Sequence, residues 1–183
     1  LYHGTWQLWD GNGNPVPDAS GSPLELSISI EVLPAGQSIL PAPLYYLVGE
    51  NESRQIWRMG TDGQVSQITF EPAGVTSFDI SPADGRVAYT SSNQLLLVDA
   101  TGAGRQVLVT AGADEYLSSP AWSPDGTRLT YGLGGIHVYT PATGEDRLIL
   151  ENNNSIYAGA YRRYSPLSWS PDGSKVAVFI GYY

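Results

Sequence analysis

Trp122-Ser123-Pro124-Asp125-Gly126 returns later in the chain as Trp169-Ser170-Pro171-Asp172-Gly173, and a longer form, Ile80-Ser81-Pro82-Ala83-Asp84-Gly85, precedes both. The Ser-Pro pairs begin at residues 81, 123 and 170, so the segment repeats after 42 and then 47 residues. A period of about 40–45 residues with several short strands in each unit is typical of a β-propeller, in which each unit forms one blade. We therefore predict an all-β fold.

The clearest unit predicts four strands, at residues 117–123, 127–133, 136–140 and 146–150. The turns between them carry Pro, which presets φ, and Gly, which supplies positive φ. The preceding unit aligns with it and predicts strands at 75–81, 86–91, 94–99 and 105–110. One unit earlier, the last three strands are predicted at 44–48, 55–59 and 65–69. The last unit contributes its first two strands, at 167–170 and 175–180. Residues 44–183 thus predict about three and a half four-stranded antiparallel blades.

Propellers usually have four to eight blades, so this ring is incomplete. Either the polypeptide continues past Tyr183, or a second copy or a partner completes the ring. An open sheet edge is a template for pairing with another chain, so self-association through the open blade edges is a further expectation.

The Trp-Ser-Pro-Asp-Gly turn is followed by a short apolar strand and then by a Leu-Leu-Val or Ile-Trp strand that ends in Asp-x-x-Gly. This pattern resembles TolB-type, WD-like propeller repeats, over roughly residues 44–183. The resemblance implies that Trp122 and Trp169 are packing residues. It says less about function, because such repeats occur in periplasmic adaptors, in peptidases and in many surface proteins.

The first 43 residues have a different pattern. Residues 4–9 alternate and lead into Asp10-Gly11-Asn12-Gly13-Asn14, a hairpin signal, and residues 24–32 alternate as one half-buried strand. Together with Tyr2, Trp6 and Leu8, they resemble the closing strands of the four-tryptophan Ig-like domain. We predict the C-terminal end of an Ig-like β-sandwich at 1–33, a Pro-rich linker at 34–43 and an incomplete TolB-like propeller at 44–183.

Composition narrows the possible partners. The net charge of −9 disfavours nucleic acid and anionic membrane surfaces, which need basic side chains. The absence of cysteine excludes disulfides and thiolate metal sites. No apolar run reaches the roughly 18 residues of a membrane span, so we expect no membrane insertion.

No catalytic or metal-binding constellation is expected in this chain. His3 and His137 are the only histidines, and neither accompanies a G-x-S-x-G nucleophile motif. We expect His137 to be a structural or exposed residue in the third strand of a blade. Hence we predict no enzyme activity, no cofactor and no metal.

Two groups of acidic residues have simpler explanations than a metal site or a carboxylate pair. Asp10, Asn12, Asn14 and Asp18 resemble the opening of a calcium loop, but the hairpin explains the same residues. Asp125 and Asp172 stand in equivalent turns of different blades, where Asp stabilises the turn.

The most irregular stretch is residues 151–166, the longest connection from a fourth strand to the next first strand. Tyr and Arg are enriched at binding hot spots, and loops on rigid scaffolds often carry function. We hypothesise a ligand-binding surface at this connection; the alternative is an ordinary inter-blade loop whose arginines pair with nearby acids. Its candidate residues are Tyr157, Tyr161, Arg162, Arg163 and Tyr164.

We expect a non-catalytic binding or scaffold module of an extracytoplasmic bacterial surface or envelope protein, which presents propeller loops to a protein or glycan partner. One alternative is the recognition portion of a larger cell-wall hydrolase or peptidase whose catalytic domain lies outside this chain. Another is a structural role in a filament or coat.

Overall fold

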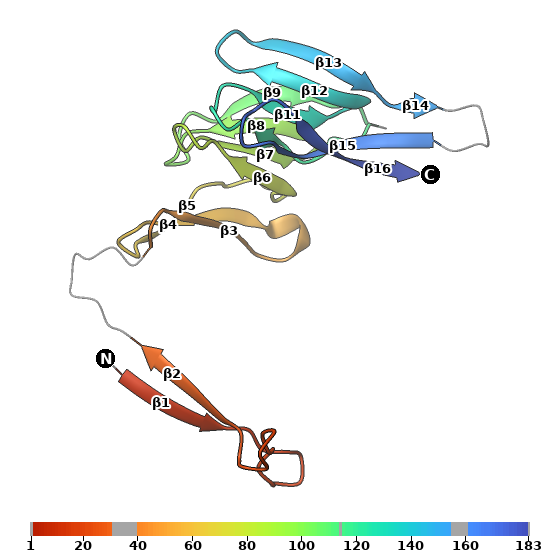
Figure 1. The fold of residues 1–183 in the computed structure, drawn as a ribbon. Coiled ribbons are helices and arrows are strands. Elements are labelled where there is room, and N and C mark those ends of the chain that lie inside the picture. The colour runs from red at the N-terminus through yellow and green to blue at the C-terminus, as the bar shows by residue number, and fades with distance from the viewer. Residues whose placement is uncertain (1, 31–39, 114, 155–160, 183) are drawn as a thin grey trace. The chain divides into compact units, whose positions relative to one another are not determined.

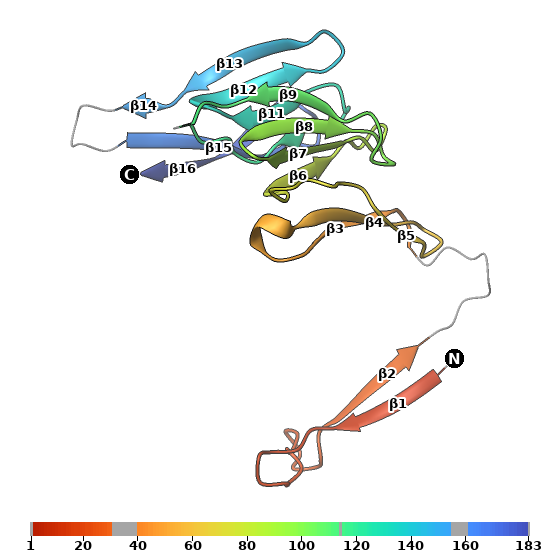
Figure 2. The same ribbon diagram turned by 180° about the vertical axis from the view of Figure 1, so that it is seen from behind.

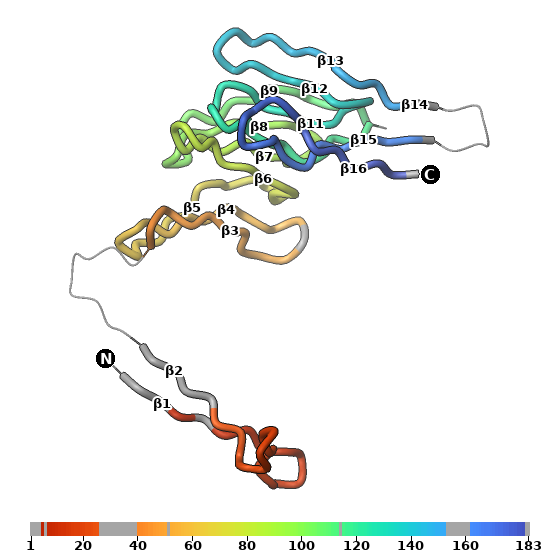
Figure 3. Tube along the Cα trace, in the orientation of Figure 1, coloured from red at the N-terminus to blue at the C-terminus, as the bar shows by residue number. Residues whose placement is uncertain are grey.

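The computed structural model describes residues 2–30, 40–113, 115–154 and 161–182, and Figure 3 follows their trace. These residues form β-strands and a single short 3-10 helix at Asn51–Ser53, so the predicted all-β class is confirmed. No helix in this part of the chain is long and apolar enough to cross a membrane. The chain divides into two compact units, Leu1–Ala42 with Thr61–Gly63, and Pro43–Gly60 with Gln64–Tyr183.

The N-terminal unit contains one antiparallel strand pair. Strand β1 (Tyr2–Gln7) pairs with β2 (Glu25–Ile30), from Tyr2 opposite Ile30 to Gln7 opposite Glu25. A pair of strands does not distinguish an Ig-like sandwich from other β-folds, so that assignment stays a prediction. Residues 31–39, which include most of the predicted linker, lie outside the described residues.

Two turns of one kind lie between β1 and β2. In the first, the Asp10 carboxylate accepts the backbone N–H groups of Asn12 and Asn14 at 2.9 and 2.8 Å. In the second, Asp18 accepts those of Ser20 and Ser22 at 2.7 and 3.0 Å. These backbone bonds confirm that the acidic residues stabilise turns.

The second unit consists of four antiparallel sheets that follow one another along the chain, from orange to blue in Figures 1 and 2. The first sheet contains β3 (Leu44–Val48), β4 (Gln55–Met59) and β5 (Val65–Gln67). The second contains β6 (Ser77–Ile80), β7 (Val87–Ser91), β8 (Gln94–Val98) and β9 (Gln106–Thr110). The third contains β10 (Ala121–Trp122), β11 (Leu129–Gly132), β12 (Gly135–Thr140) and β13 (Glu145–Glu151). The fourth contains β14 (Asn153–Asn154), β15 (Tyr161–Trp169) and β16 (Val176–Tyr182).

Neighbouring sheets share apolar side chains from their facing surfaces. Because successive residues of a strand point to opposite faces, β8 serves two interfaces. Leu96 and Val98 join a buried cluster with Ile56 of β4, whereas Leu95 and Leu97 join a cluster with Tyr131 of β11. Each sheet is therefore covered by the next, as propeller blades are.

The repeated turns also link one sheet to the next. The Arg86 guanidinium lies 5.0 Å from the Trp122 ring centroid, and the Arg128 guanidinium lies 4.6 Å from the Trp169 ring. Arg86 and Arg128 follow the turns of the second and third sheets, and each reaches the tryptophan one sheet further along. This recurring contact explains why the Trp and the Arg repeat with the period of the blade.

The connection predicted as a loop at residues 151–166 is partly strand, which corrects the sequence-based interpretation. Strand β15 begins at Tyr161, pairs with β16 along its length, and also pairs with β14 through Arg162 opposite Asn153. Proline cannot donate to a ladder, but Pro166 lies at a register shift, where a strand tolerates it.

Candidate binding site

The turn aspartates are structural, as predicted. In the third sheet the Asp125 carboxylate accepts the Thr127 N–H at 3.0 Å and the Ser123 hydroxyl. Asp172 makes the corresponding bonds to Ser174 and Ser170. Both hydrogen bonds lower the pKa of these carboxyls, to about 2 in each case. The bond from the serine hydroxyl has the larger effect and the backbone N–H bond the next largest.

The predicted ligand-binding residues separate onto two faces of β15. Arg163 pairs with Gly181 and Ser165 with Phe179, so these four side-chain positions share one face. Arg162 and Tyr164 belong to the opposite face, where Asn152 Oδ1 accepts the Tyr164 backbone N–H at 2.9 Å. Tyr157 lies outside the described residues, and only the backbone of Tyr161 is described.

Arg163 contributes to a pocket of about 280 Å³, and its guanidinium lies 4.9 Å from the Tyr116 ring centroid. Tyr116 and Phe179 are 56% and 57% exposed as residues, so both are accessible to a ligand. We call this the Arg163–Tyr116 pocket; it is lined by Tyr116, Arg163, Ser165, Phe179 and Gly181.

The segment that carries Tyr116 is anchored before it reaches the pocket. The Asn93 side chain donates to the Ala111 and Gly112 carbonyls at 3.2 and 2.6 Å. The Glu115 carboxylate accepts the Gly112 N–H at 2.6 Å. The backbone that leads to Tyr116 is thus anchored at residues 111 and 112, which limits the entropy that this segment loses when a ligand binds.

Sequence reasoning missed Tyr116. Residues 111–120 connect a fourth strand to the next first strand, as residues 151–160 do one unit later. That equivalence was the available signal, because both connections reach the same end of neighbouring blades.

Arg163 and Tyr116 suit an acidic or aromatic group. A guanidinium is always charged, offers several planar donors and stacks on aromatic rings. Charge-assisted hydrogen bonds from arginine to a carboxylate are among the stronger ones, and Ser165 adds a hydroxyl at the same pocket. The pocket can therefore hold a carboxylate-bearing or aromatic side chain.

His137 belongs to a hydrogen-bonded cluster and not to a nucleophilic triad. Its Nδ1 lies 3.1 Å from Asp146 and its Nε2 lies 3.0 Å from the Leu133 carbonyl oxygen. The buried Tyr131 donates its hydroxyl to Asp146 at 2.6 Å and stacks on the imidazole with centroids 5.0 Å apart. His137 lies in the third strand of its sheet, as predicted, and both ring nitrogens have partners in the same sheet or its turn.

Tyr89 occupies the position of Tyr131 one sheet earlier and makes a similar bond. Its hydroxyl donates to Glu71 at 2.7 Å, and Arg105 binds the same carboxylate at 2.7 and 3.1 Å. The Arg105 hydrogen bonds lower the pKa of the Glu71 carboxyl, against an opposing effect of burial. Burial and the bond to Glu71 raise the pKa of the Tyr89 phenol.

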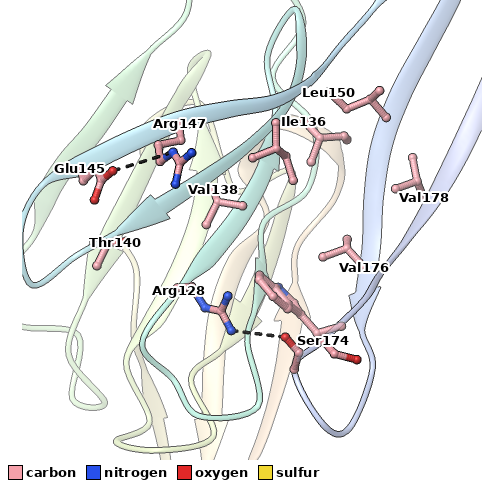
Figure 4. A pocket seen from close by; sticks show the side chains of 13 residues that line it. Arg128, Ile136, Val138, Thr140, Glu145, Arg147, Leu150, Ser174, Val176 and Val178 are labelled. Carbon is pink, nitrogen blue, oxygen red and sulfur yellow. Dashed lines mark hydrogen bonds and ion pairs between the residues drawn. The ribbon is translucent and has the colours of Figure 1, made fainter.

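A cavity of about 480 Å³ lies between the third and fourth sheets (Figure 4). Ile136 and Val138 form one side and Val176 and Val178 the other. We call it the β12–β16 groove; its lining also includes Arg128, Thr140, Glu145, Arg147, Ile149, Leu150, Trp169, Gly173 and Ser174.

The same surface is covered one interface earlier. Leu97, the counterpart of Val138, is 7% exposed and shares a cluster with Tyr139 of β12, whereas Val138 is only partly buried. The fourth sheet has no described third strand to supply a counterpart of Tyr139. The groove thus has the place and the apolar character of a site for one more antiparallel strand.

No group of three or more His, Asp or Glu side chains is placed to hold a metal ion in the part of the chain that the structure describes.

Comparison with known proteins agrees with the propeller geometry. The Tol-Pal system protein TolB of Methylococcus capsulatus is 32% identical over 114 residues, which are 55% of this chain and 24% of that protein. TolB from Acinetobacter baumannii matches with a TM-score of 0.51 and 15% identity, over 75% of this chain and 46% of that one. Oligogalacturonate lyase from Vibrio parahaemolyticus matches with a TM-score of 0.50 and 13% identity, over all of this chain and 67% of the lyase. No protein-family model matches the chain.

These likenesses define the fold as a β-propeller of the TolB type. The chain spans about a quarter of the length of the curated relative and under half of the Acinetobacter structure. Both solved structures are under 25% identical to this chain, so they show the fold alone.

Proposed function

We propose that this chain is a non-catalytic binding module of an extracytoplasmic envelope or surface protein, and that it presents the Arg163–Tyr116 pocket to a protein partner. The observation that carries the proposal is the placement of an arginine over an anchored, half-exposed tyrosine beside Phe179. Arg and Tyr in a shared pocket are typical hot-spot residues.

The curated relative supports a protein partner and an envelope location. By its name, that TolB is a component of the Tol-Pal system, and it shares 32% identity with this chain over 114 residues. The pocket chemistry adds that the partner supplies an acidic or aromatic side chain.

We also propose that the β12–β16 groove mediates self-association. The outer edge of β16 is unpaired among the described residues, and the groove beside it is apolar. An extended strand from a second copy would satisfy the free backbone groups and cover the valines.

The alternative of a recognition portion of a larger hydrolase stays a prediction, because nothing in the described part of the chain favours it.

A displayed peptide library selected on the purified chain tests the pocket. We expect enrichment of Asp or Glu next to Phe, Tyr or Trp. The substitution Arg163→Ala should weaken a selected peptide about tenfold or more, as expected for a hot-spot arginine. Arg162→Ala is the matched control, since Arg162 is exposed on the other face of β15. Equal affinity in the two variants would refute the assignment.

A further inference from the structure

Another cavity, of about 340 Å³, lies where β6, β10 and β15 of three successive sheets come together. Each of these strands, β6, β10 and β15, runs into a Ser-Pro turn, and β10 packs against both of the others. The walls are largely aromatic and apolar, with one carboxylate among them: Phe78, Asp79, Pro120, Trp122, Leu167 and Trp169.

Asp79 is the unusual member of this cavity. The residues at the equivalent ladder position in the next two sheets are Ala121 and Ser168, so the fold does not need a charge there. Asp79 Oδ2 accepts the Trp122 N–H at 2.6 Å, and Oδ1 accepts the Ile80 N–H at 2.9 Å. A carboxylate has about four acceptor sites, so each oxygen retains capacity for another donor.

Among the described residues, no cation pairs with the Asp79 carboxylate. Arg86 and Arg128 lie over the tryptophan rings that line the cavity, and Arg86 is already paired with Asp84 at 2.7 Å. Burial raises the pKa of the Asp79 carboxyl, and the two backbone N–H bonds only partly oppose that effect.

We propose that this cavity binds the ammonium group of a lysine side chain carried by a protein partner. The apolar stem of the lysine would contact Phe78 and Leu167, and the ammonium would donate to the free acceptor sites of Asp79. The net charge of −9 raises the local concentration of cations. This site is separate from the Arg163–Tyr116 pocket and takes the opposite charge.

Titration of the ¹⁵N-labelled chain with n-butylammonium chloride tests the proposal, with 1-butanol as the neutral probe of similar shape. The Trp122 and Ile80 amides donate to Asp79, so their signals should shift and saturate with butylammonium and should move little with butanol. Asp79→Asn should weaken binding about tenfold, because it removes the charge but keeps the shape. Glu50→Gln, which removes an exposed carboxylate elsewhere, should have no effect.

Two results would overturn the proposal: butanol that shifts these amides as strongly as butylammonium, or unchanged affinity in Asp79→Asn. If Asp79→Asn does not fold, a pH titration of the Asp79 carboxyl carbon of the wild type, followed by ¹³C NMR with and without butylammonium, tests the site instead. Bound butylammonium must lower the titration midpoint of Asp79, and an unchanged midpoint contradicts the site. Arg163→Ala leaves this readout intact, so failure here and failure of the proposed function are distinguishable.

Discussion

Removal of Arg105 should destabilise the chain because it leaves the Glu71 carboxylate buried with one partner fewer. The Glu71 side chain is 6% exposed and its ion pair with Arg105 is 2.7 Å long. Breaking a buried pair from one side costs about 3–5 kcal/mol. The Arg105 side chain is 49% exposed, so water replaces part of the lost interaction and we expect Arg105→Ala to cost about 2 kcal/mol at neutral pH.

The pH dependence of that cost identifies its cause. In the wild type the pKa of Glu71 is lowered by Arg105, so its contribution to stability is present above the unfolded pKa of about 4.3 and is lost as pH falls through the folded value. In Arg105→Ala the burial effect remains and only the Tyr89 hydroxyl bond still opposes it, so the folded pKa of Glu71 is higher than in the wild type. At about pH 3.5, below the unfolded pKa, the ionised form of Glu71 contributes less in both proteins, and the destabilisation should shrink.

Urea unfolding at the two pH values measures both effects. Arg147→Ala is the control, because its ion pair with Glu145 is 3.9 Å long and exposed, and should be worth under about 0.5 kcal/mol. Adding Glu71→Gln to Arg105→Ala should recover stability at neutral pH, because the buried charge disappears. A cost that is the same at both pH values, or no recovery in the double variant, would refute this reasoning.

Two further predictions concern the turn and the open edge. The pKa of the Asp125 carboxyl is lowered to about 2, so the difference in stability between the wild type and Asp125→Ala should be full above about pH 4 and vanish towards pH 2. Acid unfolding of the two proteins, followed by circular dichroism, measures this difference. A difference that persists at pH 2 would count against the role of Asp125 in the turn. Val178→Lys places a charge in the β12–β16 groove and should reduce concentration-dependent association in sedimentation velocity. The control Ala73→Lys, at an exposed turn, should leave association unchanged. Equal association in both variants would exclude the β12–β16 groove as the self-association site.

The repeated Ser-Pro-Asp-Gly turn made most of the fold predictable from the sequence. Residues 44–48 and 55–59 were predicted with the bounds that β3 and β4 have, because they align with strands of the repeating unit. Residues 161–166 were misassigned since β15 is defined by its partners: β14 and β16 pair with it from distant positions, and its own Arg and Pro residues carry no strand signal.

The candidate site was only partly predictable, for a similar reason. The sequence indicated Arg163 through its composition, but the face it occupies depends on its register with Gly181. Tyr116 and Asp79 became visible only when separate sheets were brought together. A single sequence shows which residues repeat with the period of the blade. It shows less well which residues become neighbours when the blades pack together.

The central claim is that each sheet packs on the next one along the chain. Nuclear Overhauser contacts from the Arg86 and Arg128 δ-protons to assigned indole rings test it directly. The account predicts that Arg86 contacts Trp122 and that Arg128 contacts Trp169, since the guanidinium groups lie 5.0 and 4.6 Å from those rings. Absence of both contacts, or contact of Arg86 with Trp169 in place of Trp122, would contradict the successive stacking of blades.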